Sequence, residues 1–260
     1  MKISIAIAGK GGTGKTTLAA LLVRTFRELK IGPILAVDAD PNSTLADALG
    51  VEQGTPLADI REKGSSAEGS PASGVGRVRA LEDELQRAVT EADGFDLITM
   101  GQPEGPRCYC YVNTLLRKSL DGLTRNYDAV VLDNEAGMEH LSRRTTNDVD
   151  FLIAVMNPTM PSFRAVKRIL TLSRQLPIQI GHRAVLVTRV GAEGLPEQVE
   201  QELATLDAQR LPDIPQDDDV ERAGAIGQDV FRLPAKGAAL TAVAKVIETL
   251  RGTLCVPQEH

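Results

Sequence analysis

The residues with the clearest chemistry lie between positions 3 and 17, where Gly9 is separated by four residues from Gly14-Lys15-Thr16. Placed between an apolar strand and a helix, this spacing is the pattern of a loop that binds nucleotide phosphates. Backbone N–H groups turn toward the phosphates, and the positive end of the helix adds to the attraction. We expect Lys15 to reach the β- and γ-phosphates and the Thr16 hydroxyl to hold Mg²⁺. The predicted phosphate-binding residues are Gly9, Lys10, Gly11, Gly12, Thr13, Gly14, Lys15, Thr16 and Thr17.

Carboxylates follow two other short apolar runs. Asp38 and Asp40 close the run 34–37, and Asp133 closes the run 129–132. Because ligands of open parallel sheets bind outside the carboxyl ends of the strands, we expect these side chains beside the phosphate loop. Asp133 fits the carboxylate that holds Mg²⁺ through water, and the backbone N–H of Gly137 completes an Asp-x-x-x-Gly pattern that can contact the γ-phosphate. Ordinary turn residues after a strand are the alternative interpretation.

Cys108 and Cys110 are the most distinctive pair outside the loop. In an extended backbone, residues two apart point to the same face, so the two sulfurs are presented together. Thiolates select soft or borderline metals such as nickel and zinc, but two sulfurs are too few for a stable site. A two-fold dimer supplies four. Two ordinary thiols and a strained redox disulfide are the alternatives, and Cys255 has no apparent partner.

The composition sets limits on the class of protein. With 260 residues, 42% of them hydrophobic and 25% charged, the chain can bury a sizeable core. The net charge of −6 argues against a broad nucleic-acid-binding face. No apolar run reaches membrane-spanning length, and the three cysteines cannot all pair. We therefore expect a cytoplasmic protein with reduced thiols that binds neither nucleic acid nor membrane.

Apolar periodicity predicts the elements that position these groups. Helical spacing from residue 18 to 29 ends at Gly32-Pro33, and a short strand follows. Further strands are expected at 95–100, 129–132, 151–156 and 184–187, and helices at 79–91, 159–175, 195–206 and 238–250. Residues 64–78 are interpreted as a mobile surface insertion. The chain 1–260 is thus predicted to be one α/β domain with a single doubly wound, mainly parallel sheet and helices on both faces.

The loop also carries Lys10, and with it resembles the variant phosphate loop of the MinD, ParA and nitrogenase-iron-protein ATPases. The resemblance implies that Lys10 crosses a dimer interface to the nucleotide of the partner, so that Lys10 and Lys15 are both catalytic. Asp38-Ala39-Asp40-Pro41 resembles the first switch region of the same superfamily. By that resemblance Asp40 orients or deprotonates the attacking water, and Asp38 lies near Mg²⁺.

Together with the segments 107–110 and 133–141, these motifs resemble the CooC-type maturation ATPases, which deliver nickel to carbon monoxide dehydrogenase, with a sister branch serving acetyl-CoA synthase. The resemblance implies a homodimer that hydrolyses ATP to ADP and phosphate. It also implies that the two Cys108-x-Cys110 pairs hold one Ni²⁺ or Zn²⁺ at the interface, and that the client is one of those two apoenzymes. Three further residues look characteristic of this branch and have no assigned role: Glu135, Glu139 and His140.

Some features depart from the resemblance or leave other functions open. Thr188-Arg189 stands where many relatives carry an Asn that reads adenine, and Asn157 is the alternative reader, so ATP is inferred from the superfamily. An iron–sulfur electron donor resembling nitrogenase iron protein is one rival. A positioning ATPase of the MinD or ParA kind is the other, but it would need a basic tail or a Lys/Arg stripe, and the last predicted helix is neutral.

Overall fold

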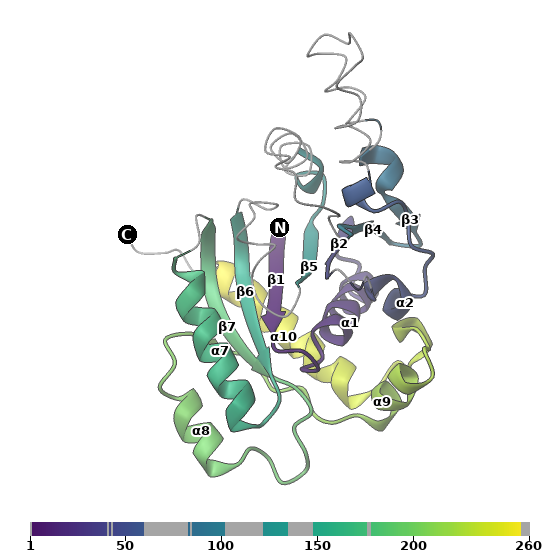
Figure 1. Ribbon diagram of the computed structural model, residues 1–260. Coiled ribbons are helices and arrows are strands. Elements are labelled where there is room, and N and C mark those ends of the chain that lie inside the picture. Colours follow the sequence, from purple (N-terminus) through teal and green to yellow (C-terminus); the bar gives the residue numbers. More distant parts are fainter. Residues whose placement is uncertain are drawn as a thin grey trace.

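The computed structural model describes residues 2–40, 42, 44–59, 83, 85–101, 122–134, 148–175 and 178–255. Within them eight strands form one sheet in the order β3-β4-β2-β5-β1-β6-β7-β8 (Figure 1). All neighbouring strands are parallel except β3 and β4, which are antiparallel. The strands are β1 Ile3–Gly9, β2 Ile34–Ala39, β3 Thr90–Ala92, β4 Phe95–Thr99, β5 Ala129–Asn134, β6 Asp148–Met156, β7 Gln179–Val187 and β8 Gln209–Arg210. The predicted fold class is therefore confirmed. The predicted insertion at 64–78 lies outside the described residues.

Helices cover both faces of this sheet (Figure 1). They are α1 Lys15–Glu28, α2 Leu45–Leu49, α7 Met160–Ser173, α8 Glu197–Leu203, α9 Asp218–Ala225, the 3-10 turn η2 Val230–Arg232 and α10 Ala238–Cys255. Alternate residues of the central strand β1 serve the two faces, because successive side chains of a strand point in opposite directions. Ile5 and Ile7 pack with α1 and α10, and Ala6 and Ala8 pack with α7 and α8. Since both faces are covered, the strands read as nearly continuous apolar runs.

One predicted element is wrong in part. The charged segment 79–91 was expected to be helical to its end, but Thr90–Ala92 forms β3 and pairs with β4. The two residues between these strands are Asp93 and Gly94, and Gly94 has φ 86°. Asp-Gly is a strong two-residue hairpin signal because its glycine tolerates a left-handed backbone, and it identifies this turn in the sequence.

A buried arginine joins α1 to the C-terminal part of the chain. Arg24 is only 4% exposed. Its guanidinium donates to the carbonyl of Val230 and, at 3.0 Å, to that of Leu233, and its Nε lies 2.7 Å from Glu28 Oε1. The adjacent Arg27 lies over the ring of Phe231, 4.9 Å from its centroid. The helix that follows the phosphate loop is therefore fastened to η2 and to the chain just after it.

Replacing this arginine provides a test of that connection. Arg24→Met is expected to lower the free energy of unfolding by about 3 kcal/mol, because two buried carbonyls lose a charged donor. Urea denaturation measures the change. Arg232→Met is the matched control, since the Arg232 side chain is 75% exposed and only pairs with Asp229; its cost is expected to stay below about 1 kcal/mol. Equal effects of the two substitutions would contradict the proposed connection.

Candidate functional site

The predicted phosphate loop lies between the end of β1 and the start of α1, in the middle of the sheet. Gly12 and Gly14 have φ 78° and 83°, in the left-handed region that glycine adopts without strain. A tight turn closes between Lys10 and Thr13, because the backbone N–H and the hydroxyl of Thr13 donate to the carbonyl of Lys10 at 3.3 and 2.8 Å. The neighbours of β1 are β5 on one side and β6 on the other. From β1 the chain runs to β2, which lies on the β5 side, and from β5 it crosses to β6 on the opposite side. Ligands of such sheets bind at this reversal.

The first turn of α1 presents positive charge to the end of the loop. Gly14 is the N-cap and has no side chain to occupy the backbone N–H groups, and no acidic residue lies in the first turn. Lys15 is 7% exposed, whereas Thr16 and Thr17 are half-buried. Uncapped N–H groups and the helix dipole together favour an anion at this position. The exposed Lys10 stands at the other end of the loop.

Two carboxylates lie in one row across the neighbouring strands. Asp38 of β2 is in register with Asp133 of β5, which is in register with Ile7 of β1. Both aspartates are fully buried. The Asp38 carboxylate accepts hydrogen bonds from the backbone N–H groups of Asp40 and Leu45 at 3.1 and 2.9 Å. Asp38 thereby holds the start of α2 against the end of β2.

In the described part of the chain, Asp133 does not have hydrogen bonds like those that Asp38 accepts. Neither of its carboxylate oxygens has a well-formed hydrogen bond to the described residues. Burial raises its pKa to about 7, and the nearby Thr16 hydroxyl and Lys15 ammonium offset only part of that shift. Burial also raises the pKa of Asp38 to about 6, against the two backbone hydrogen bonds. A buried carboxylate without partners is costly, so this group is suited to a cation.

The surroundings of Asp133 fit Mg²⁺ bound to a phosphate. Magnesium takes oxygen ligands, keeps several waters, and is commonly held by one or two carboxylates together with phosphate oxygens. Asp133 supplies a carboxylate without a well-formed hydrogen bond to the described residues, and Thr16 supplies a hydroxyl beside it. Lys15, which is close enough to lower the pKa of Asp133, adds a positive charge. These side chains can therefore bind a metal–phosphate group at the carboxyl ends of β1 and β5.

Asp40 follows β2 and is half-buried. One of its carboxylate oxygens accepts hydrogen bonds from the backbone N–H and the side-chain amide of Asn42, at 2.9 and 2.8 Å. Its own backbone N–H donates to Asp38. One oxygen of the Asp40 carboxylate is thus engaged in a local turn.

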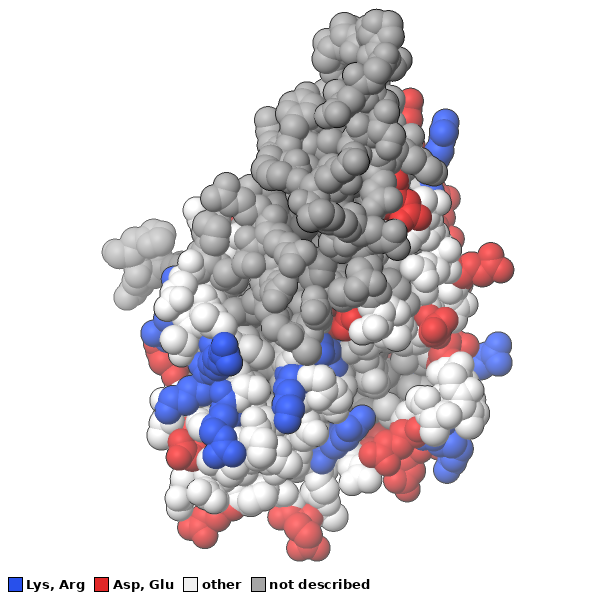
Figure 2. Space-filling model, in the orientation of Figure 1, with Lys and Arg blue, Asp and Glu red and all other residues white. Residues whose placement is uncertain are grey.

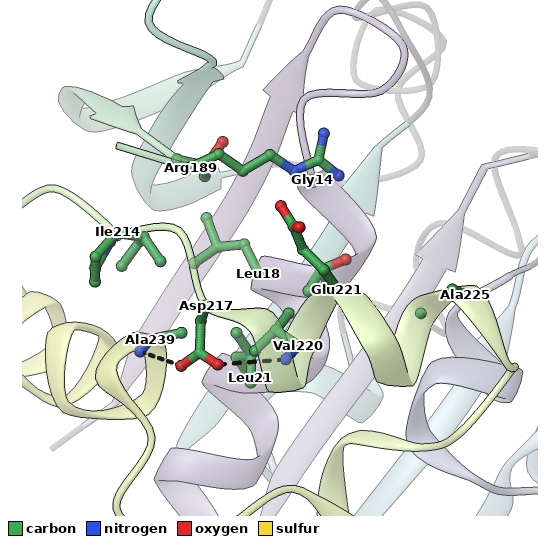
Figure 3. A pocket seen from close by; sticks show the side chains of 14 residues that line it. Gly14, Leu18, Leu21, Arg189, Ile214, Asp217, Val220, Glu221, Ala225 and Ala239 are labelled. Atoms are coloured by element: carbon green, nitrogen blue, oxygen red, sulfur yellow. Dashed lines mark hydrogen bonds between the residues drawn. The ribbon is translucent and has the colours of Figure 1, made fainter. Parts of the chain in front are cut away.

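A cavity of about 500 Å³ adjoins the loop (Figure 3). Leu18 and Leu21 of α1 form one apolar wall, and Val220 of α9 forms another. The cavity is lined by Gly14, Thr17, Leu18, Leu21, Thr188, Arg189, Ile214, Pro215, Asp217, Val220, Glu221, Gly224, Ala225 and Ala239. Apolar walls with a few polar groups are typical of small-molecule sites. A cavity of this size beside the loop can accommodate a planar base with its sugar.

The cavity wall depends on Asp217. One carboxylate oxygen accepts from the backbone N–H groups of Asp219 and Val220 at 3.1 and 3.4 Å, and the other accepts from that of Ala239 at 2.9 Å (Figure 3). Asp217 therefore caps α9 and holds it against the start of α10. Asp217 is not among the site residues predicted from the sequence, although an Asp before an acidic first turn is a typical N-cap.

The two positions considered for contact with the adenine base, 188 and 157, lie in different places relative to the cavity. Thr188 lines the cavity, whereas Asn157 does not belong to the lining. The Thr188 hydroxyl donates to the carbonyl of Thr13 at 2.8 Å, and Arg189 donates to the carbonyl of Gly12 at 3.1 Å. Both side chains therefore contact the phosphate loop.

The predicted cargo residues Cys108 and Cys110 lie outside the described residues, as does Gly137. The same holds for the three residues without an assigned role, Glu135, Glu139 and His140. Over the part of the chain that the structure describes, no three His, Cys, Asp or Glu side chains gather as a metal site. Cys255 is exposed with a free thiol. In the same ranges, no helix is long and apolar enough to cross a membrane.

Comparison with known proteins places this site in a family. The chain is 34% identical over 249 residues to an uncharacterized ATP-binding protein of Methanocaldococcus jannaschii, covering 95% of this chain and 97% of that protein. It is 32% identical over 189 residues to the carbon monoxide dehydrogenase accessory protein CooC of Rhodospirillum rubrum, covering 68% and 71%. The septum site-determining protein MinD of Pyrococcus horikoshii, solved with Mg-ADP, has the same fold, with a TM-score of 0.70 at 21% identity and 98% coverage of both chains.

The family model described as the CobQ/CobB/MinD/ParA nucleotide binding domain matches residues 4–230. That range contains the phosphate loop, both buried aspartates and most of the cavity lining. The chain therefore belongs to the CobQ/CobB/MinD/ParA family of P-loop nucleotide-binding ATPases.

Proposed function

We propose that this chain is a homodimeric, ATP-dependent metallochaperone that binds nickel at Cys108 and Cys110 and assists its insertion into carbon monoxide dehydrogenase or acetyl-CoA synthase. The observation that carries the ATP-dependent part is the buried carboxylate of Asp133 beside the phosphate loop, which has no well-formed hydrogen bond to the described residues. The similarity to CooC, together with the Cys108-x-Cys110 pair, supports the cargo and the client.

In this proposal the loop residues 9–17 bind the phosphates of ATP and the cavity binds its base. Lys15 contacts the β- and γ-phosphates, and Thr16 and Asp133 hold Mg²⁺, which neutralises phosphate charge when it is bound. Asp40 leaves its turn with Asn42 to orient the attacking water, and Asp38 keeps that segment near the phosphates.

Three further contacts complete the proposed reaction. The Gly137 N–H contacts the γ-phosphate. Lys10, which is exposed at the edge of the loop, reaches the nucleotide of the partner protomer. Because positive charge from the second copy stabilises the transferred phosphoryl group, hydrolysis depends on dimer formation.

The cargo site requires the same dimer. Two protomers bring two Cys108-x-Cys110 pairs to a shared axis, which gives four thiolates. Four sulfurs suit nickel in a square-planar arrangement or zinc in a tetrahedral one. ATP binding tightens the dimer and hydrolysis loosens it, so the nucleotide state controls metal affinity.

A nickel titration tests this proposal. Ni²⁺ is added to the reduced, metal-free protein under anaerobic conditions with ADP or ATP, while thiolate charge-transfer absorbance and mass are recorded. We expect one nickel per dimer, with an affinity that depends on the nucleotide. Cys108→Ser and Cys110→Ser are expected to abolish binding, and Cys255→Ser, the control, to preserve it.

The remaining outcomes separate the two halves of the proposal. Lys15→Ala is expected to keep nickel binding and lose its dependence on nucleotide. Wild-type binding by the Cys108 and Cys110 variants would exclude the cargo site. A brown protein with iron and sulfide would instead identify an iron–sulfur electron donor.

The surface of α7 favours a second candidate, a positioning ATPase of the MinD or ParA kind. Arg164, Lys167 and Arg168 are exposed on this helix, which contains no acidic residue, and Figure 2 shows basic side chains gathered over it. Such a face can bind an anionic surface. Co-sedimentation with DNA or anionic vesicles that is lost when these three residues become alanine would support this candidate over the metallochaperone.

A further inference from the structure

Two adjacent carbonyls of the phosphate loop are bound from the end of β7. The Thr188 hydroxyl donates to the carbonyl of Thr13 at 2.8 Å, and the Arg189 guanidinium donates to that of Gly12 at 3.1 Å. These partners are 175 and 177 positions apart in the chain. The hydrogen bonds within the loop itself, from Thr13 to the carbonyl of Lys10, are local. The end of β7 is therefore what connects the loop to the rest of the fold on this side.

These contacts determine which way the peptide groups of the loop face. A peptide whose carbonyl points toward β7 directs its N–H to the opposite side. An anion-binding loop needs its N–H groups converging on the ligand, so its carbonyls must find partners behind it. Thr188 is such a partner for the Thr13 carbonyl, whose peptide N–H is that of Gly14. Arg189 instead fixes the tight turn itself, because the N–H of the peptide that it holds, that of Thr13, donates to the carbonyl of Lys10. The contact from Thr188 is shielded, since this residue is only 7% exposed.

The end of β7 is itself held firmly. The Thr188 N–H donates to Met156 at 2.8 Å, and the Val190 N–H donates to Ile214, a residue of the cavity wall, at 3.1 Å. Between them Arg189 has φ 55°, a left-handed conformation that is unfavourable for a residue with a side chain. Strain of this kind persists where the surrounding structure requires it and is common at functional sites.

Thr188 has no hydroxyl proton left for a base. A threonine hydroxyl carries one proton, and here the closest acceptor is the carbonyl of Thr13, with Met156 farther away at 3.3 Å. The strand-end position at which relatives were expected to read adenine is thus occupied by a side chain that binds the loop.

We propose that Thr188 and Arg189 are positioning residues: they hold the carbonyls of Thr13 and Gly12 away from the phosphate site, so that the loop is ordered before the nucleotide arrives. This inference rests on the proposed nucleotide function of the loop. A preordered loop loses less conformational freedom on binding, which strengthens affinity for any nucleotide that uses its phosphates there.

The test compares isosteric and conservative variants by calorimetric binding of Mg-ATP and Mg-GTP. Thr188→Val removes the hydroxyl and keeps the shape; it is expected to weaken both nucleotides about tenfold, with their affinity ratio unchanged. Thr188→Ser is expected to restore wild-type affinity. Arg189→Ala, at an exposed position, is expected to weaken both nucleotides three- to tenfold and provides the test if Thr188→Val does not fold.

Each outcome has a distinct meaning. Loss of ATP affinity without loss of GTP affinity in Thr188→Val would show that Thr188 reads the base, and wild-type affinity in both variants would also overturn the inference. Failure of the wild-type protein to bind either nucleotide would instead reject the proposed function. Hydrogen exchange gives a second readout, since the amides of residues 12–15 are expected to exchange faster in Thr188→Val without nucleotide, while those of β6 do not.

Discussion

Gly9→Ala is expected to weaken nucleotide binding strongly and to destabilise the protein. A Cβ atom at this position would lie 2.5 Å from the carbonyl oxygen of Val155 and 2.8 Å from the Thr13 hydroxyl. Val155 belongs to β6, which is paired with β1 in the middle of the sheet, so neither backbone can move away without breaking the ladder. Thr13 can move, but only by leaving its contact with the Lys10 carbonyl and opening the loop.

We expect a loss of about 3 kcal/mol in the free energy of unfolding, from overpacking of a rigid region. Displacement of the loop by about 1 Å is expected to weaken Mg-ATP binding by about 100-fold. Thermal unfolding and calorimetry measure the two effects. Gly252→Ala in α10 is the control: a Cβ there meets nothing within 4 Å, and a helix gains up to about 1 kcal/mol from the exchange. Wild-type ATP affinity in Gly9→Ala would contradict the assignment of the loop.

Asp133→Asn is expected to reduce hydrolysis by at least about 100-fold and to stabilise the nucleotide-free protein at pH 8. The two effects have one origin. Within the described residues the buried carboxylate has no well-formed hydrogen bond, so its charge is unfavourable until a cation arrives. A neutral amide of the same shape removes that cost and also removes the carboxylate that we propose holds Mg²⁺. Hydrolysis assays and urea denaturation measure these two effects.

The sign of the pH dependence follows from the raised pKa values. In the folded state Asp133 has a pKa of about 7 and Asp38 of about 6, against 3.8 without burial. Between about pH 4 and pH 7 the folded protein therefore binds more protons than the unfolded chain. The free energy of unfolding, measured in EDTA, is expected to fall by up to about 6 kcal/mol as the pH rises through this range.

Asp133→Asn should remove most of this slope and leave the smaller part that belongs to Asp38. The control is Asp207→Asn, because the Asp207 side chain is 89% exposed. Mg-ATP is expected to stabilise the wild-type protein more at pH 8 than at pH 6, since protons compete with magnesium for the carboxylate. A slope that survives in Asp133→Asn would show that another buried group is responsible.

The sequence alone was sufficient to predict the phosphate loop and the fold class. The loop is contiguous: glycines, Lys15 and Thr16 lie within a few positions, and the flanking strand and helix follow directly. The parallel strands were also predictable, because burial on both faces leaves continuous apolar runs such as 129–132. Hydrophobic periodicity did not predict the short helices. Helices α2 and α9 span only five and eight residues, too few to show a clear period.

Only the tertiary structure decided how distant residues meet around that loop. Strand register places Asp38 beside Asp133, and burial, which is a property of the whole fold, raises their pKa values. The cavity combines α1, the end of β7 and α9, which are far apart in the chain. In the sequence, Thr188 only replaces the Asn with which many relatives read adenine. In the structure, the chain crossovers bring its hydroxyl to the carbonyl of Thr13. A linear pattern encodes residue types and local spacing, whereas partners, burial and charge depend on long-range packing that no local pattern contains.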